Sequence, residues 1–339
     1  MKSGSSILNA FTVDVEDYYH VSAFSHKFSY DEWEHFPSRV VDNTHRLLKI
    51  LERHSVHGTF FVLGWVARKF PQLIREIQRG GHEIGCHSFW HRLIYDLHPD
   101  EFRRDLREGR DELEQVLGTA VLSHRAPSFS ITSRSLWALE ILVQEGFQID
   151  SSIFTVRHDR YGLKNAERFA HLIETPDGAL WEFPPAIYRL WKWNLPVSGG
   201  GYFRLYPAGF SAFCLRQSNL VHHHPFVFYI HPWELDPEQP RIPSRMTTRF
   251  RHYVNLSRTE HKLDMLFRQF SFGTLSEALR DHERRWRSDG KDVKRIDLRD
   301  ELRGPLSWQV QNLRRQHSST PHNISLTLKP SIPRDTSTP

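Results

Sequence analysis

The sequence is poor in cysteine and has no long apolar run. Its 339 residues include only two cysteines, Cys86 and Cys214, and no CxxC spacing. This excludes a disulfide scaffold and suits a reducing compartment. No segment approaches the roughly 18 to 20 apolar residues of a membrane helix, and the opening residues MKSGSSILNAFTVDVEDYY lack the apolar core of a signal peptide. We therefore expect a cytoplasmic protein without a transmembrane segment.

Most of the chain has a net charge close to zero. The net charge is +5 at pH 7, with 45 Lys and Arg against 40 Asp and Glu. Residues 284–339 alone hold 12 basic and 6 acidic residues, so the remainder is close to neutral. Because the basic charge is confined to the end of the chain, we do not expect a nucleic acid as partner. We predict a basic, polar and disordered tail over residues 286–339.

Predicted strands and helices alternate through the first 150 residues. Short apolar runs predict strands, and apolar residues three and four apart predict amphipathic helices, with Ser38 and Thr132 as N-caps. This alternation is typical of parallel βα units, in an α/β barrel or a doubly wound sheet. Residues 198–207, with three glycines, are predicted to be a loop. The predicted strands are 7–13, 58–63, 82–86, 120–127, 147–150 and 226–230, and the predicted helices are 38–55, 64–81, 99–118, 132–146, 261–270 and 274–281.

Residues suited to catalysis follow several of these strands. The first strand is followed by DVED, residues 14–17, the third by HSFWH, residues 87–91, and the fourth by RAP, residues 125–127. His231 follows the strand at 226–230. Functional side chains collect at the carboxyl ends of parallel strands. We therefore expect carboxylates, three imidazoles and one arginine at a common edge of the sheet.

The pair His87 and His91 is a candidate metal site. Two histidines and one carboxylate suit a divalent ion and leave positions for water and substrate. The two rings share one face if the segment after Cys86 is helical. A metal-bound water becomes a nucleophile near neutral pH, a second carboxylate held by Arg125 would serve as base, and His231 would serve as acid. With 22 histidines in the chain, the combination and not the pair carries this hypothesis.

In their order and combination, these motifs resemble those of the polysaccharide deacetylases of the NodB-homology type, carbohydrate esterase family 4. They resemble most closely the subgroup encoded with exopolysaccharide and PEP-CTERM/exosortase loci in bacteria. The resemblance assigns residues 7–285 to a catalytic domain, with a family-specific extension from about residue 150. It rests on FTVDVEDYYHVSAF (11–24), GTFFVLGWVARKFP (58–71), GHEIGCHSFWH (81–91), SHRAPSFSIT (123–132), IDSSIF (149–154), GGGYFRLYP (199–207) and YIHPWELD (229–236).

The resemblance implies an α/β fold, a distorted (β/α) barrel of the NodB type with fewer than eight complete units. It also implies roles for single residues. Asp14 would be the general base, Arg125 would tether it, and His231 would be the general acid. His87 and His91 would bind one divalent ion, most simply Zn²⁺, although Co²⁺, Ni²⁺ and Mn²⁺ accept similar ligands.

The opening motif departs from the family pattern at the metal-binding carboxylate. The family has two adjacent aspartates, whereas here Val15 follows Asp14. Strand alternation places Glu16 on the same side as Asp14. If the strand ends at Val15, Asp17 could turn inward instead. Both Glu16 and Asp17 are therefore candidate metal ligands.

The implied reaction is hydrolysis of N-acetyl groups on amino sugars of a polysaccharide or a lipid-linked glycan precursor, in exopolysaccharide biosynthesis. Ser128 would present a backbone N–H to the oxyanion. A cytoplasmic location favours a lipid-linked substrate and peripheral association with an exopolysaccharide assembly complex. The candidate contacts to sugar rings are Trp90, Trp191, Trp193, Tyr202 and Trp233.

Two other functions fit the same residues less well. An amidohydrolase of a small cyclic amide would keep the metal and the acid and base, but it would need a closed pocket in place of an open groove. A non-catalytic scaffold in an exopolysaccharide assembly complex would be recognised by missing ligands. Asp14, His87, His91, Arg125 and His231 are all present, which favours the enzyme.

Overall fold

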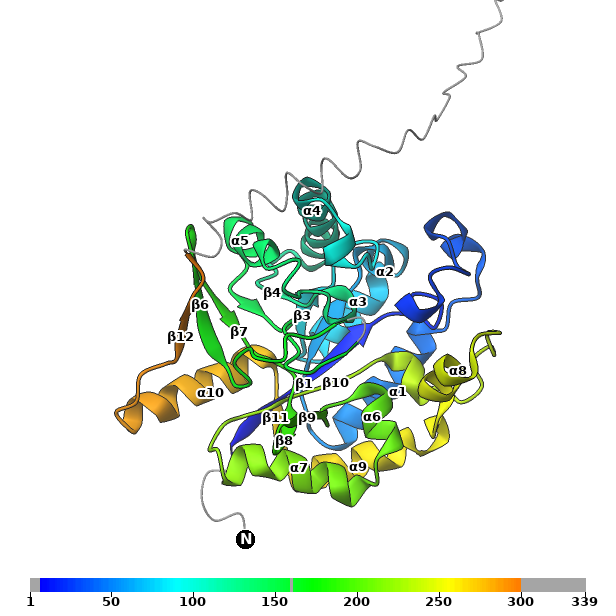
Figure 1. Cartoon of the computed structure of the whole chain (residues 1–339). Coiled ribbons are helices and arrows are strands. Elements are labelled where there is room, and N and C mark those ends of the chain that lie inside the picture. The colour runs from blue at the N-terminus through cyan, green and yellow to red at the C-terminus, as the bar shows by residue number, and fades with distance from the viewer. Residues whose placement is uncertain (1–6, 159–160, 300–339) are drawn as a thin grey trace, which may run out of the picture.

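The described chain alternates strand and helix up to residue 150 and then changes character (Figure 1). The computed structural model describes residues 7–158 and 161–299. The strands are β1 (Leu8–Val15), β2 (Thr59–Val62), β3 (Glu83–Cys86), β4 (Ser123–His124), β5 (Ile149–Asp150), β6 (His171–Thr175), β7 (Gly178–Glu182), β8 (Ile187–Leu190), β9 (Trp193–Pro196), β10 (Val227–Ile230), β11 (Ser271–Gly273) and β12 (Arg295–Asp297).

The helices vary in length from single turns to five turns. The α-helices are α1 (Val40–Arg53), α2 (Gly64–Lys69), α3 (Pro71–Arg79), α4 (Pro99–Leu117), α5 (Trp137–Gln144), α6 (Gly200–Leu205), α7 (Ala208–Leu220), α8 (Met246–Tyr253), α9 (Thr259–Gln269) and α10 (Leu275–Ser288). The short 3-10 helices are η1 (Ser22–Phe24), η2 (Tyr30–His35), η3 (Ile94–Asp96), η4 (Pro127–Phe129), η5 (Pro232–Leu235) and η6 (Leu256–Arg258).

One large sheet organises the molecule. Its strand order is β10-β1-β2-β3-β4-β5-β7-β6-β12, and β11 also pairs with β1. Among the described strands of this sheet, β6 and β7 alone pair in antiparallel fashion. β8 and β9 form a separate antiparallel hairpin. The prediction of an α/β fold with a mostly parallel sheet is confirmed.

The sheet curves back toward its own first edge. Two isolated parallel bridges, Pro185 to Val227 and Gly199 to Tyr229, join the chain after β7 to β10. A Cβ atom on Gly199 would lie 1.9 Å from the carbonyl oxygen of Tyr229, so a larger residue could not approach this closely. No named strand of the described chain fills the gap between β7 and β10. The sheet is therefore open in its pairing and barrel-like in its curvature.

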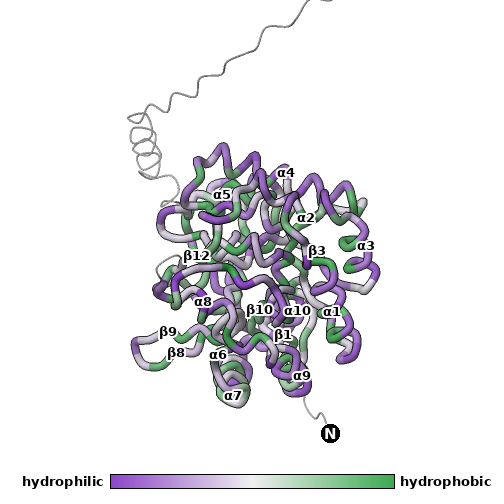
Figure 2. Tube along the Cα trace, turned by 90° about the vertical axis from the view of Figure 1, so that its right-hand side faces the viewer, coloured by the Kyte–Doolittle hydropathy of each residue, from purple (hydrophilic) through white to green (hydrophobic). Residues whose placement is uncertain are grey.

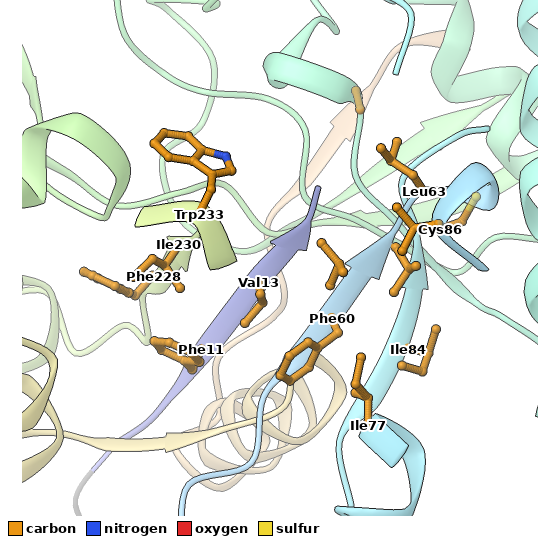
Figure 3. Packing of buried hydrophobic residues seen from close by; sticks show 14 of the residues in the cluster. Phe11, Val13, Phe60, Leu63, Ile77, Ile84, Cys86, Phe228, Ile230 and Trp233 are labelled. Carbon is orange, nitrogen blue, oxygen red and sulfur yellow. The ribbon is translucent and has the colours of Figure 1, made fainter. Parts of the chain in front are cut away.

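Apolar side chains fill the space between the sheet and its helices. All four residues of β2 and of β10 are buried, because helices or loops cover both faces of these strands. This double burial explains why the strand sequences are continuously apolar. Figure 3 shows the packed side chains, among them Phe11, Val13, Phe60, Leu63, Ile77, Ile84, Cys86, Phe228, Ile230 and Trp233.

The predicted helix over residues 64–81 is two helices. α2 ends at Lys69, and α3 begins at Pro71. Proline has no N–H for the helical hydrogen bond and disfavours helical geometry in the residue before it. Phe70 accordingly has φ −129° and ψ 57°, outside the helical region. The apolar spacing was correct, but it did not show the break.

Two predicted helix caps are wrong. Ser38 does not cap α1: its hydroxyl donates to Oδ2 of Asp17 at 2.8 Å. The same oxygen accepts the N–H groups of Arg39 and Val40, so a distant carboxylate caps the helix. Thr132 lies five residues before α5, which begins at Trp137. Local sequence indicated that a cap was needed but not which residue supplies it.

The predictions fail most often after residue 150. The loop predicted over residues 198–207 contains α6, which forms over Gly200–Leu205. The strands β6 to β9 and the helices α7 and α8 were not predicted. The expected tail from residue 286 also begins too early, because α10 continues to Ser288 and β12 pairs with β6. Residues 300–339 of that tail lie outside the described residues, so their disorder stays a prediction.

No helix in the described part of the chain is long and apolar enough to cross a bilayer. Hydrophilic and hydrophobic residues alternate along most helices, and this gives the mixed colouring of the trace in Figure 2. Both cysteines are buried and unpaired.

Candidate active site

Parallel strands bring the predicted residues to one edge of the sheet. Asp14 lies in β1, and Glu16 follows the last residue of that strand. His87 directly follows β3, Arg125 follows β4, and His231 follows β10. These strands run in the same direction, so their carboxyl ends meet. The sequence predicted this convergence from the strand ends alone.

Glu16, His87 and His91 form a buried cluster of metal-binding side chains. One ligand atom from each residue lies within 4.8 Å of the others. Oε2 of Glu16 is 2.8 Å from Nε2 of His91, and the two imidazole rings are 5.3 Å apart. No second cluster of this kind is found over residues 7–158 and 161–299.

A loop, and not a helical turn, brings the two histidines together. His91 has a φ of +54°, in the left-handed region that side chains other than glycine rarely adopt. Asp105 of α4 accepts the N–H groups of Phe89 and Trp90, each at 3.2 Å. The segment after Cys86 is not helical, so the helical alignment that the sequence allowed for His87 and His91 does not occur. Anchoring of the loop on α4 determines their approach.

A backbone contact sets the tautomer of His87. Its Nδ1 atom lies 2.7 Å from the carbonyl oxygen of Arg125. A carbonyl only accepts, so Nδ1 carries the proton and the lone pair of Nε2 is available for a metal. Burial lowers the pKa of His87 to about 4, so the ring is neutral near pH 7. Neutral imidazole is the form that coordinates metals.

One buried oxygen of Glu16 faces the imidazole of His91. Nε1 of Trp233 donates to Oε1 at 3.1 Å, whereas Oε2 lies 2.8 Å from Nε2 of His91 and accepts no well-aligned hydrogen bond within the described chain. Burial would raise the pKa of Glu16, but attraction to His91 and His231 outweighs it and holds this pKa well below its usual range. An ionised, buried oxygen beside two imidazoles is costly unless a cation binds there. The donor set fits a divalent ion with nitrogen and oxygen ligands.

Arg125 holds Asp14 in place through a buried network. Nη1 of Arg125 donates to Oδ1 of Asp14 at 2.7 Å and to the hydroxyl of Thr12 at 2.8 Å. Nε and Nη2 donate to the carbonyl oxygen and the hydroxyl of Ser151. The guanidinium also lies 4.3 Å from the ring centroid of Phe61. These contacts fix the arginine in one position, so it holds the Asp14 carboxylate in one orientation.

His231 faces two carboxylates of the opening motif, Asp14 and Glu16. Its Nε2 atom lies 3.8 Å from Oδ2 of Asp14 and 3.5 Å from Oε1 of Glu16. Nδ1 lies 2.8 Å from Oε1 of Glu234. Burial would lower the pKa of His231, but attraction to Glu16 and hydrogen bonding to Glu234 raise it to about 9. The ring is therefore protonated near pH 7, as a general acid requires.

Sequence reasoning missed the support of His231. Nε of Arg204 donates to Oε2 of Glu234 at 2.6 Å, and both side chains are buried. Burial would raise the pKa of Glu234, but Arg204 and His231 lower it to about 2. A signal was present, because Glu234 follows His231 by three residues in a short turn. Arg204 had none, since it lies in the segment predicted to be a loop.

Asp17 does not reach the metal-binding cluster. Its Oδ2 atom accepts hydrogen bonds at the start of α1, and its Oδ1 atom accepts the N–H of Tyr18 at 2.9 Å. Both oxygens are thus occupied away from His87 and His91. Of the two carboxylates that the sequence left open, the structure brings Glu16 to the histidines.

A cavity of about 370 Å³ lies beside His231. Ser128, Tyr202 and Trp233, three predicted substrate contacts, line it. Ser128 has a φ of +52°, and its hydroxyl lies 2.8 Å from that of Ser22, which also lines the cavity. A second cavity, of about 560 Å³, shares none of these lining residues. We therefore take the smaller cavity as the candidate substrate site.

The other predicted sugar contacts lie elsewhere. The ring of Trp90 packs at 5.9 Å from that of Trp33 and at 5.8 Å from that of Tyr30, outside the cavity lining. Trp191 and Trp193 project from the β8–β9 hairpin and are 91% and 73% exposed. The structure does not bring these three tryptophans to the cavity.

Two family models match successive parts of the chain, which overlap over residues 151–176. A model described as "Polysaccharide deacetylase" matches residues 28–176, which include His87, His91 and Arg125. A second, described as "Domain of unknown function (DUF3473)", matches residues 151–280, which include His231 and Glu234. The first match supports the polysaccharide deacetylase family to which the motifs were compared.

Named relatives support the same family over a shorter stretch. The peptidoglycan-N-acetylglucosamine deacetylase of Bacillus cereus is 35% identical over 98 residues, which cover 29% of this chain and 36% of that protein. The chitooligosaccharide deacetylase of Azorhizobium caulinodans is 32% identical over 100 residues, or 29% of this chain and 45% of that protein. The chain thus spans less than half the length of these relatives.

The fold is shared with a solved structure. A crystal structure from Mycobacterium smegmatis, named as a polysaccharide deacetylase, superposes with a TM-score of 0.56 at 20% sequence identity. The superposition covers 87% of this chain and 96% of that one. At this identity the likeness concerns the fold, and it extends through both halves of the chain.

Proposed function

We propose that this protein removes N-acetyl groups from amino sugars of a polysaccharide or a lipid-linked glycan precursor, as a metal-dependent hydrolase of exopolysaccharide biosynthesis. The observation that carries the proposal is a single convergence. A metal-binding cluster, an arginine-held carboxylate and a protonated imidazole meet beside one cavity. The match to the polysaccharide deacetylase family supports the same reaction.

Glu16, His87 and His91 would hold the divalent ion. The ion, which we propose to be Zn²⁺, would polarise the acetyl carbonyl and make water more acidic. Three protein ligands leave positions for water and substrate. Two observations support this assignment: a buried oxygen of Glu16 lies 2.8 Å from Nε2 of His91, and the Nδ1 contact of His87 leaves its Nε2 lone pair for a metal.

Asp14 would act as the general base. Oδ1 is engaged by Arg125, so Oδ2 remains to accept a proton from the attacking water. The guanidinium has further partners in Thr12 and Ser151, which prevent it from moving with the carboxylate. Asp14 would thus lose little orientation when it takes up the proton.

His231 would act as the general acid. Oε1 of Glu234 accepts a hydrogen bond from the Nδ1–H of His231. The Nε2–H of His231 is then directed toward Asp14 and Glu16. A proton from Nε2 would pass to the departing amine nitrogen as the carbon–nitrogen bond breaks. Arg204 keeps Glu234 ionised, so the imidazolium remains paired until the transfer.

The cavity would hold the amino sugar. Tyr202 and Trp233 offer aromatic surface to a sugar ring, and Ser128 would direct a backbone N–H to the oxyanion. One wall is formed by α8, where Phe250 is 57% exposed, so this side of the cavity meets solvent. An accessible wall supports a glycan substrate over a small cyclic amide.

The location and partners follow from the same proposal. Two buried, unpaired cysteines are compatible with the reducing cytoplasm. There a lipid-linked precursor would be the accessible glycan, and the protein would associate with the exopolysaccharide assembly complex. A scaffold without activity is less well supported, because the metal-binding cluster is complete and Asp14, Arg125 and His231 are all present, with His231 lining the cavity.

The proposal is tested by acetate release from N-acetylated oligosaccharides, measured with and without a chelator and after addition of Zn²⁺. We expect release by the wild type, loss with chelator and recovery with metal. Asp14→Asn should lower kcat by about 10²- to 10⁴-fold, the usual contribution of a general base. Asp111→Asn, an exposed carboxylate on α4, is the matched control. Acetate release that withstands both the chelator and Asp14→Asn would refute the mechanism.

A further inference from the structure

Exposed apolar side chains are concentrated between residues 190 and 250. Twelve large apolar side chains are exposed in the described residues, and ten of them lie between residues 190 and 250. The other two are Tyr30 and Leu122. Such a concentration marks an interaction surface more often than scattered exposure does. The ten are Leu190, Trp191, Trp193, Leu205, Phe210, Phe213, Leu220, Val221, Met246 and Phe250.

The β8–β9 hairpin presents the most exposed of these residues. Leu190 pairs with Trp193, so Trp191 and Lys192 form a two-residue turn at the tip. Trp191 has a φ of +55°, a strained conformation for a bulky side chain. It is 91% exposed, and nothing in the described chain buries it. A large ring held outward at a cost in backbone strain indicates contact with something outside the chain.

Aromatic contacts connect the hairpin with the cavity. The ring of Tyr188 lies 6.0 Å from that of Phe213, which joins β8 to α7. Tyr206 lies 5.4 Å from Phe210 and 6.3 Å from Tyr202, which lines the cavity. In Figure 2 the hairpin, α6 and α7 lie at the lower left, and α8 contacts α6 through Arg204, which donates to the backbone carbonyl oxygens of Arg251 and His252. These elements thus form a continuous surface that borders the candidate substrate site.

This surface carries no negative charge from its own segments. No Asp or Glu occurs between Glu182 and Glu234, or between Glu238 and Glu260, although the chain has 40 acidic residues. The same segments contain exposed Arg or Lys side chains. They are Arg189, Lys192, Arg216, Arg241, Arg245, Arg249, Arg251 and Arg258. We call the β8–β9 hairpin with α6, α7 and α8 the acid-free face.

We propose that the acid-free face binds the surface of an anionic lipid bilayer, with Trp191 and Trp193 inserted at the level of the head groups. Tryptophan rings favour the membrane interface, and basic residues around them attract anionic lipids. Apolar residues with a basic border and no acid match that surface in charge as well as polarity. The inference goes beyond the deacetylase reaction and does not depend on it.

Vesicle sedimentation tests the proposal with the full chain. Vesicles of phosphatidylcholine with and without phosphatidylglycerol are mixed with wild type and with Trp191→Ser/Trp193→Ser. We expect the wild type to bind the anionic vesicles more tightly and the double variant to bind about tenfold more weakly, because the inserted apolar area is lost. Arg189→Gln/Lys192→Gln should weaken binding to anionic vesicles about fivefold or more.

Control variants distinguish binding through the acid-free face from misfolding and from binding through the end of the chain. Leu122→Ser removes an exposed apolar residue outside the acid-free face and should bind like the wild type. All variants keep residues 300–339, so binding through that segment would not change, and thermal unfolding shows that each variant is folded. Trp191 and Trp193 contribute to the fluorescence of the wild type, and the double variant lacks this contribution. When vesicles are added to the wild type, the emission of these two tryptophans should shift to shorter wavelength.

Three results would overturn the proposal. The first is absence of wild-type binding to anionic vesicles at low salt. The second is equal binding by the wild type and the tryptophan double variant. The third is self-association of the wild type, measured by light scattering, that is lost in the double variant while no vesicle binding occurs. The last result would make the face an interface between copies of the chain.

Discussion

The two halves of the described chain, residues 7–150 and 151–299, supply different parts of one site. The first half supplies the carboxylates, the metal-binding histidines and Arg125, all at the ends of parallel strands. The second supplies His231 with Glu234 and Arg204, most of the cavity wall and the acid-free face. The proposed base and acid therefore come from different halves, with 3.8 Å between Oδ2 of Asp14 and Nε2 of His231.

This division shows how the fold joins the proposed catalytic residues to the elements that shape the cavity and the outer surface. Among the described strands of the second half, β10 alone leads directly into a proposed catalytic residue, and its pairing with β1 brings His231 to Asp14. The rest of the second half surrounds β10 with helices and hairpins. Change in those elements would alter the cavity and the outer surface while the geometry of the metal cluster is retained.

The largest expected effect concerns the first half. Glu16→Gln removes the one carboxylate of the metal cluster, so metal binding and activity should fall together. We expect a loss in kcat/KM on the order of 10³-fold, since a bound metal stabilises the transition state by several kcal/mol. Metal content after dialysis and acetate release are the two measurements. A variant that retains stoichiometric metal would show that Glu16 is not a ligand.

Arg125→Lys should have the next largest effect. A lysine ammonium has neither the planar geometry nor the number of donors needed to hold Asp14, Thr12 and Ser151 at once. Misplacement of the base should lower kcat about 10²-fold, while metal content is unchanged. Thermal unfolding is the control, because this arginine is completely buried. Loss of metal along with activity would instead mean that the whole site had collapsed.

Glu234→Gln tests the contribution of the second half. The pKa of His231 is raised to about 9, with Glu16 and Glu234 as its main attractive partners. The general acid must be protonated, so activity should fall as the pH rises through this pKa. Without the Glu234 carboxylate the pKa falls, and the alkaline limb of the kcat profile should move to lower pH. A limb that does not move would exclude Glu234 as the partner of the acid.

Stability should depend on pH through the same pair. In the metal-free protein, the raised pKa of His231 stabilises the folded state fully below the unfolded value near 6.5. That contribution is lost as the pH rises through about 9. The free energy of unfolding should therefore decrease between these values. The decrease should be smaller in Glu234→Gln, which denaturant unfolding at several pH values would show.

The smallest expected effect separates Asp17 from Glu16. Oδ2 of Asp17 accepts hydrogen bonds from the hydroxyl of Ser38 and from the backbone N–H groups of Arg39 and Val40. Asp17→Asn replaces this carboxylate by an amide, which has an NH₂ donor in place of one oxygen. Loss of this cap should lower the free energy of unfolding by about 1 to 2 kcal/mol. Metal content and kcat should stay within about twofold of the wild type, an effect too small to reflect lost metal binding. Loss of metal in this variant would show that Asp17 is a ligand.

The first half was largely predictable because its signals are local. Several strands are short apolar runs that end in reactive residues, as DVED begins within the last residues of β1 and HSFWH follows β3. The second half was not, because the hairpins β6–β7 and β8–β9 and the short helix α6 lack a strong period. Glycines at 199–201 are typical of a loop, although two of them begin a helix beside β10.

The sequence by itself determined which residues could form the site: Asp14, His87, His91, Arg125 and His231 each end a recognisable run. Tertiary structure alone decided between Glu16 and Asp17. The two carboxylates are adjacent in the chain, and their orientation depends on partners far away, since the start of α1 binds Asp17 and the histidine loop faces Glu16. The support that Arg204 gives to His231 through Glu234 also depends on contacts between distant segments. The same holds for the assembly of the acid-free face. Contacts between distant segments have no local pattern from which to predict them.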